Sequence, residues 1–152
     1  MISDGLRVAL LSALPLTELR GAIPIALTIY KMPVFWAYIY AVLGNILPAI
    51  FLLLFLKPFS EYLSRFYYFD IFFKWLFKRT RRNTQEKFEK YGALFLLLFV
   101  AIPLPVTGAW TGSVAAFIFG IRFFYAFPSI VGGVMISGII VSLASLGVIS
   151  FV

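Results

Sequence analysis

Apolar residues form four long blocks along the chain, and the blocks differ in how they are interrupted. Residues 34–56 and 123–152 contain no charged side chain. A helix needs about 20 apolar residues to cross a hydrocarbon core, so each of these two blocks is long enough to span a membrane. Residues 6–30 and 92–121 are also apolar but are broken by proline, glycine and polar residues. The pattern predicts an all-α integral membrane protein.

The two interrupted blocks carry their breaks near the middle. The breaking residues are Pro15 in the first block, and Pro103, Pro105, Gly108 and Gly112 in the second. Proline removes a backbone donor and disrupts the preceding turn. Unpaired backbone groups cannot face lipid, so an interrupted segment must be buried in protein or line a wet cavity. We therefore expect each block to form a re-entrant, broken helical hairpin; a simple kinked span is the alternative.

The two halves of the chain resemble each other. Residues 13–16 match residues 101–104 at an offset of 88, and residues 42–45 match residues 130–133 at the same offset. If the segment between the halves is cytoplasmic, the two uninterrupted spans run in opposite directions. This order predicts two inverted-topology repeats, residues 6–56 and 92–152, within a single membrane domain over residues 1–152. Such a plan is common in transporters with midplane sites.

Residues 57–91 connect the halves and are strongly basic. They hold nine of the thirteen Lys and Arg residues (Lys57, Arg65, Lys74, Lys78, Arg79, Arg81, Arg82, Lys87 and Lys90). Aromatic residues lie among them, which is typical of an amphipathic helix in a headgroup layer. An excess of Lys and Arg marks a loop that stays in the cytoplasm. We expect a basic, aromatic amphipathic connector on the cytoplasmic side of a multi-pass inner-membrane protein.

Glu18 is the only carboxylate inside any apolar block, and Arg20 lies two residues after it. Ionisable side chains at membrane depth are costly and mark functional candidates. A helix that begins near Gly21 would direct free N–H groups toward the same place as Arg20, which suits an anion. We predict that a substrate or ion binds at Glu18, Arg20, Gly21, Pro24, Thr107 and Thr111. The alternative is a structural role, in which the charged pair fixes the hairpin and the hydroxyls satisfy freed backbone groups.

Several chemistries are excluded by composition. The chain contains no cysteine and no histidine, so thiol chemistry is absent and a metal site would need oxygen ligands alone. The carboxylates are too scattered for a paired acid and base, and no glycine-rich phosphate loop is present. We expect no enzymatic activity, no metal site and no cofactor. The net charge of +7 is concentrated in the connector and does not indicate nucleic acid.

The segment Glu18-Leu19-Arg20-Gly21-Ala22-Ile23-Pro24, with the Pro- and Gly-rich stretch at residues 103–120, is similar to the small multi-drug export protein family. The resemblance covers nearly the whole chain and implies a short membrane protein that exports drug-like compounds. The expected hairpins also resemble the DedA superfamily, which implies movement of lipid-linked phosphates or phospholipids across bilayers. DedA proteins usually carry a basic residue in the second hairpin motif, and residues 103–120 contain none.

Three functions remain open. The first is a small transporter that moves an amphipathic or anionic substrate through a midplane site. The second is a flippase or scramblase for a lipid phosphate or phospholipid. The third is a membrane scaffold without transport activity, held together by small residues such as Gly108, Gly112, Ala116 and Gly120, which recur every four residues and allow close helix packing. Membrane lipids are the expected partners, and a homodimer is compatible with these small-residue faces.

Overall fold

The computed structural model describes residues 2–63, 65–80, 85–104 and 107–151, and within these ranges the secondary structure is entirely helical. In chain order the helices are α1 (Ile2–Ala13), α2 (Glu18–Thr28), α3 (Val34–Leu63), α4 (Tyr67–Thr80), α5 (Gln85–Ala101), α6 (Ala109–Ile118) and α7 (Phe123–Phe151). The all-α prediction is confirmed. Pro105, predicted as part of the second break, lies outside the described residues.

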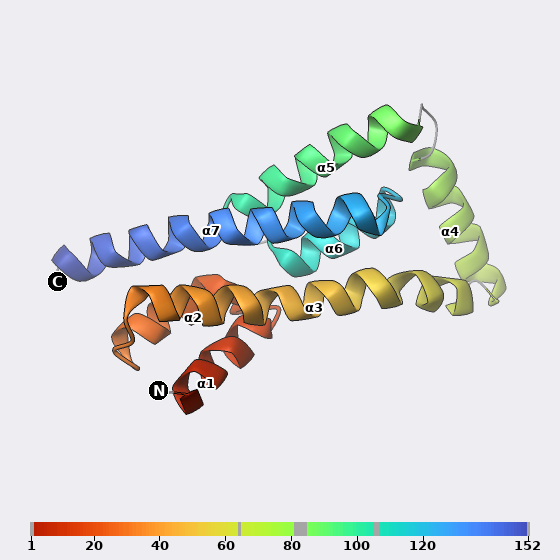
Figure 1. Ribbon diagram of the computed structural model, residues 1–152. Helices are drawn as coiled ribbons and strands as arrows, with labels where there is room; N and C mark the ends of the chain where they lie inside the picture. Colours follow the sequence, from red (N-terminus) through yellow and green to blue (C-terminus); the bar gives the residue numbers. More distant parts are fainter. Residues whose placement is uncertain (1, 64, 81–84, 105–106, 152) are drawn as a thin grey trace.

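The two longest helices, α3 and α7, pack against each other and run in opposite directions (Figure 1). They contain 30 and 29 residues, which corresponds to about 45 Å at 1.5 Å per residue. Both are long and apolar enough to cross a membrane. Large apolar side chains such as Phe51 and Leu143 are exposed on them. Exposed apolar surface of this kind is typical of helices that contact membrane.

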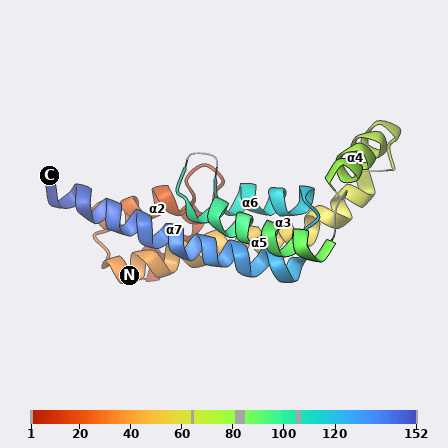
Figure 2. The same ribbon diagram turned by 90° about the horizontal axis from the view of Figure 1, so that it is seen from above.

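A pair of short helices precedes each long helix. The pairs are α1 with α2 and α5 with α6, and the members of each pair contact each other. Helices α1, α2 and α6 have 12, 11 and 10 residues, so each extends about 15–18 Å, roughly half of a 30 Å hydrocarbon core. The two pairs approach from opposite ends of the α3–α7 pair, and their connections lie next to each other (Figures 1 and 2).

The first connection turns the chain within four residues. Helix α1 ends at Ala13, and the hydroxyl of Thr17 donates to the carbonyl of Leu11. The backbone N–H of Glu18 donates to the carbonyl of Leu14 at 2.9 Å. Glu18 has a φ of 43°, in the left-handed region that residues other than glycine seldom occupy. Helix α2 begins at Glu18. The prediction that it begins near Gly21 was wrong by three residues.

Gly112, which we predicted to break the second block, lies inside α6 instead and is buried there. A Cβ at this position would lie 2.5 Å from Cγ2 of Val100 on α5. Gly112 therefore allows α5 and α6 to pack closely, and the break itself ends at Gly108. Pro24 likewise lies inside α2 without ending it.

The connector contains more than one helix. Helix α3 continues through Lys57 and Pro58 to Leu63, so the first part of the predicted connector belongs to a long apolar helix. Helix α4 is the separate basic and aromatic helix that we expected, with exposed Trp75 and an ion pair of 2.7 Å between Lys74 and Asp70. It lies at one end of the bundle, between α3 and α5 (Figure 1).

Two glycines allow the short helices to pack closely on the long ones. A Cβ at Gly44 of α3 would lie 2.7 Å from the carbonyl carbon of Ala9 on α1. A Cβ at Gly133 of α7 would lie 2.8 Å from the carbonyl oxygen of Leu97 on α5. In both cases the obstacle is backbone, which cannot rotate away. These contacts fix α1 on α3 and α5 on α7, and so determine where the hairpin tips meet.

Candidate functional site between the hairpin tips

The carboxylate of Glu18 joins the two hairpin tips. It is only 8% exposed, it lies against Gly108, and it accepts a hydrogen bond from the backbone N–H of Trp110. The first turn of a helix carries unpaired N–H groups and a partial positive charge. Glu18 therefore caps α6 from a position 90 residues earlier in the sequence than Gly108. A Cβ at Gly108 would lie 2.5 Å from the carboxyl carbon, so this contact requires glycine.

Arg20 forms a second link between the tips. Its Nη2 donates to Oγ1 of Thr107 at 3.0 Å and lies 4.0 Å from Oε2 of Glu18. Opposite charges 4 Å apart attract by about 4 kcal/mol at an effective dielectric constant near 20. The side chain is 23% exposed, and its buried Nε has no hydrogen-bond partner among the described residues. A guanidinium has five N–H donors, so this one is only partly satisfied by the protein.

The hydroxyl of Thr107 organises the second connection. It accepts from the backbone N–H of Leu104 at 3.1 Å and from Arg20, and it donates to the carbonyl of Ile102 at 2.5 Å. A hydroxyl offers one donor and two acceptor sites, so these contacts use its full capacity. In this arrangement Thr107 holds the loop and the guanidinium rather than offering a free group to a ligand.

Trp110 braces the tips from the second hairpin. Its indole Nε1 donates to the carbonyl of Ala13 at 3.0 Å. Ala13 is the last residue of α1, where carbonyls lack intrahelical partners. Backbone and side chain of Trp110 thus contact both arms of the first hairpin. Sequence reasoning missed this residue, although a single indole donor in an apolar block requires an acceptor nearby.

A cavity of about 750 Å³ lies between the tips, and we call it the tip cavity. Its volume falls within the range of ligand sites, roughly 300–1,000 Å³. Seven residues predicted from the sequence line it, namely Pro15, Glu18, Arg20, Gly21, Pro103, Thr107 and Thr111, together with Leu16, Thr17 and Trp110. The structure therefore brings the two interrupted blocks together around one polar site. The hydroxyl of Thr111 makes only a long contact, 3.4 Å to the carbonyl of Gly108.

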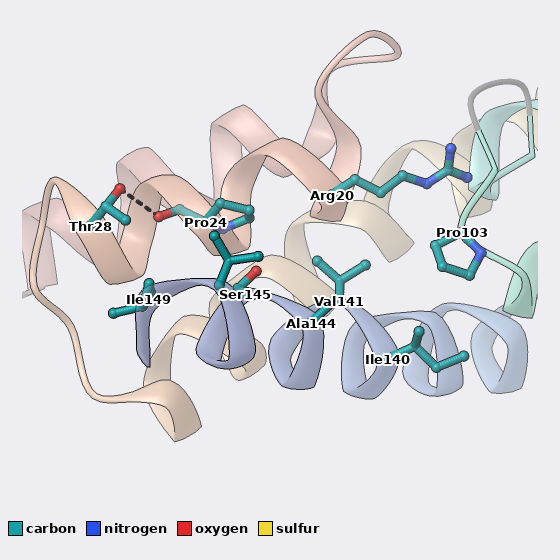
Figure 3. Close-up of a pocket in the computed structure, with 10 residues that line it drawn as sticks. Arg20, Pro24, Thr28, Pro103, Ile140, Val141, Ala144, Ser145 and Ile149 are labelled. Atoms are coloured by element: carbon teal, nitrogen blue, oxygen red, sulfur yellow. Dashed lines mark hydrogen bonds between the residues drawn. The ribbon is translucent and has the colours of Figure 1, made fainter. Parts of the chain in front are cut away.

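A second cavity of about 410 Å³ adjoins the first, and we call it the α2–α7 groove. Figure 3 shows α7 side chains facing α2, with Arg20 directed toward Pro103 at one end and Thr28 at the other. Arg20 and Pro103 line both cavities. The remaining lining residues are Pro24, Thr28, Ile140, Val141, Ala144, Ser145, Val148 and Ile149. Pro24 is thus placed beside the apolar groove rather than in the tip cavity.

No curated protein and no solved structure matches the chain significantly. The model of the family described as "Putative small multi-drug export protein" matches residues 18–140. The matched region begins at Glu18, includes both sides of the tip cavity and covers most of the chain. With the two long apolar helices, this match indicates a membrane protein. The chain belongs to the small multi-drug export protein family.

Proposed function

We propose that this protein is a small inner-membrane transporter that moves an amphipathic or anionic substrate through the tip cavity. One observation carries the proposal. Two helical hairpins from opposite ends of the molecule place an acid, a base and a helix N-terminus around one cavity. Buried charge between broken helices is costly and is typical of a substrate pathway. We also propose no enzymatic role, because the described lining of the tip cavity offers a single carboxylate and a single guanidinium rather than a paired acid and base.

We further propose that both hairpins are re-entrant. Three of their four helices, α1, α2 and α6, are about half as long as the hydrocarbon core is thick, and α5, with 17 residues, extends about 25 Å. Each hairpin begins and ends at the same end of the α3–α7 pair (Figure 1). If α3 and α7 span the membrane, the tips lie near its midplane, where the polar backbone of the two connections is enclosed by protein.

Equivalent contacts in the two halves support an inverted repeat. The turn before each long helix contains a residue with positive φ, Lys31 at 48° and Gly120 at 68°. The closely packed glycines of the long helices are Gly44 and Gly133. Lys31 and Gly120 are 89 residues apart, and so are Gly44 and Gly133. This spacing is one residue longer than the offset of 88 at which the two sequence halves match. On these spacings we propose that the two halves repeat one packing arrangement in opposite orientations; the two hairpins approach from opposite ends of the bundle (Figure 1).

The basic connector supports a proposed orientation of the protein in the membrane. Helix α4 and the charged ends of its neighbours gather at one end of the bundle, and we place that end in the cytoplasm because positively charged loops remain there. The first hairpin then enters from outside and the second from the cytoplasm. Membrane lipids are the partners that this placement requires, and we retain a homodimer as a proposal, with no role for nucleic acid.

Transport by purified protein in liposomes tests the proposal, with anilinonaphthalene sulfonate as the anionic amphiphile and ethidium as the cationic one. Glu18→Gln and Arg20→Ala each remove one of the two charges that line the tip cavity, and we expect the transport rate to fall at least about tenfold. Arg7→Ala is the matched control, since it removes a guanidinium from an exposed pair with Asp4 on the same hairpin. It should leave transport unchanged.

The competing functions give different results in the same experiment. A scaffold without transport activity would tolerate both substitutions in the tip cavity, whereas Gly133→Leu would disrupt its packing. If wild-type protein moves neither probe, or if Glu18→Gln and Arg20→Ala transport normally while the protein accumulates and folds, the proposed function is wrong.

A flippase or scramblase is the second candidate function. It is favoured by the exposed groove residues Ile140, Ala144 and Val148, because a groove open along its side could admit a lipid from the bilayer. The activity can be measured with a fluorescent phospholipid in the inner leaflet of liposomes. An impermeant quencher in the outer solution reaches this lipid only after it has crossed to the outer leaflet, so the loss of fluorescence reports the crossing.

A further inference from the structure

The tip cavity and the α2–α7 groove share two lining residues, Arg20 and Pro103, and they differ in chemistry. The tip cavity is lined by charged and hydroxyl-bearing side chains, including Glu18 and Thr111. The groove is lined almost entirely by carbon. Arg20 is the side chain at the boundary between them, and Figure 3 shows it at the end of the groove. A ligand that occupies both cavities must therefore have a polar end and an apolar end.

The charge available to such a ligand is positive. The carboxylate of Glu18 is buried against Gly108, accepts from the backbone N–H of Trp110 and faces the positive end of α6. Within the described part of the chain, Arg20 donates one hydrogen bond, to Thr107, and lies 4.0 Å from Glu18. The acid is thus neutralised by the helix terminus as well as by the guanidinium, and the guanidinium is left under-compensated. A head group that approaches it should be an anion with several acceptor oxygens.

The groove is open along its side. Ile140, Ala144 and Val148 line it from α7 and are exposed, as is Thr28 at its far end. From Ile140 to Ile149 the α7 backbone rises about 13 Å, a length suited to an extended alkyl chain. An alkyl chain that moves from the bilayer into the groove exchanges one apolar environment for another, so no hydrophobic effect drives this step. The groove positions the chain but adds little to the affinity. Selectivity must then come from the head group at Arg20.

We propose that the two cavities form one binding site for an anionic amphiphile that enters sideways from the bilayer. Its head group contacts the guanidinium of Arg20 in the tip cavity, and its alkyl chain lies in the α2–α7 groove. This inference rests on the proposed function and specifies its substrate: an anionic lipid-like molecule drawn from the membrane, rather than a cationic drug or a soluble anion.

Binding to the full chain in phosphatidylcholine nanodiscs tests this site. A Trp36→Phe/Trp75→Phe background leaves Trp110, which lines the tip cavity, as the only tryptophan. Binding of dodecyl phosphate should change the fluorescence of Trp110. Dodecyltrimethylammonium should bind at least about tenfold more weakly than dodecyl phosphate. Arg20→Gln should weaken the binding of dodecyl phosphate by at least about tenfold as well, because a charge-assisted hydrogen bond is lost.

The groove is tested by two adjacent positions on α7. Ala144→Phe fills the groove. A ligand whose head group is held at Arg20 then has no space for its chain, and this steric conflict should weaken dodecyl phosphate binding at least about tenfold. Leu143→Phe is the matched control, because Leu143 is also exposed on α7 but does not line the groove. It should stay within about twofold of the parent protein.

The outcomes separate this inference from the proposed function. If Ala144→Phe binds dodecyl phosphate as the parent does, or if the ammonium compound binds equally well, the amphiphile site is wrong. If inorganic phosphate shows the same Arg20 dependence and Ala144→Phe has no effect, the tip cavity binds soluble anions, so the proposed function survives and this inference fails. If no anion binding depends on Arg20, both fail.

Discussion

The contact between Glu18 and Gly108 makes a quantitative prediction about stability. Gly108 has extended backbone, with φ of 167°, so alanine is acceptable to the chain itself. The added Cβ would, however, lie 2.5 Å from the carboxyl carbon of Glu18. Gly108→Ala should therefore displace the carboxylate from the N-terminus of α6. The loss includes a charge-assisted hydrogen bond of about 1.5–3 kcal/mol and a helix-terminus interaction of about 0.3–2 kcal/mol. Because these overlap, we expect a net cost of about 2–4 kcal/mol.

Equilibrium unfolding of the purified chain in mild detergent, followed by helical circular dichroism, measures this cost. Gly147→Ala is the control, because a Cβ there has no neighbour within 4 Å and alanine favours a helix interior by about 1 kcal/mol. In a Glu18→Gly background, which also suits the positive φ of that residue, Gly108→Ala should cost almost nothing. The interpretation is refuted if Gly108→Ala is as stable as wild type, or if its cost is the same in both backgrounds.

Three further predictions concern residues outside that contact. Lys31→Gly should raise the free energy of unfolding and Gly120→Ala should lower it, each by about 1 kcal/mol, because both positions have positive φ. Chemical unfolding measures both changes, and a change of the same sign in the two variants would contradict the prediction. Gly44→Ala should cost at least about 2 kcal/mol by pushing α1 from α3, a loss visible as a lower thermal midpoint; a midpoint equal to that of wild type would show that α1 can move freely. Thr107→Val should reduce transport, because the guanidinium loses its acceptor, while Thr107→Ser retains it; equal rates for both variants would exclude the hydroxyl from the site.

Several features were predictable from the sequence because they depend on local physics. Proline and glycine in apolar blocks predicted both breaks, and Pro15 and Pro103 do lie in the connections between short helices. The isolated charges Glu18 and Arg20 identified one side of the tip cavity, since an ionisable group in an apolar block requires compensation. Gly112 was misassigned for a related reason: glycine can break a helix or allow close packing, and only the neighbour, Val100, distinguishes the two roles.

The sequence by itself determined the helical class, the two long apolar helices and the polarity of each segment, because these follow from composition and spacing along the chain. The tertiary structure alone decided which groups meet. Glu18 is neutralised by the N-terminus of α6, 90 residues away, and the α2–α7 groove joins residues from opposite ends of the chain. No local pattern encodes these pairings. They arise where Gly44 and Gly133 let the short helices pack closely on the long ones, so that packing distance, rather than sequence distance, sets the site.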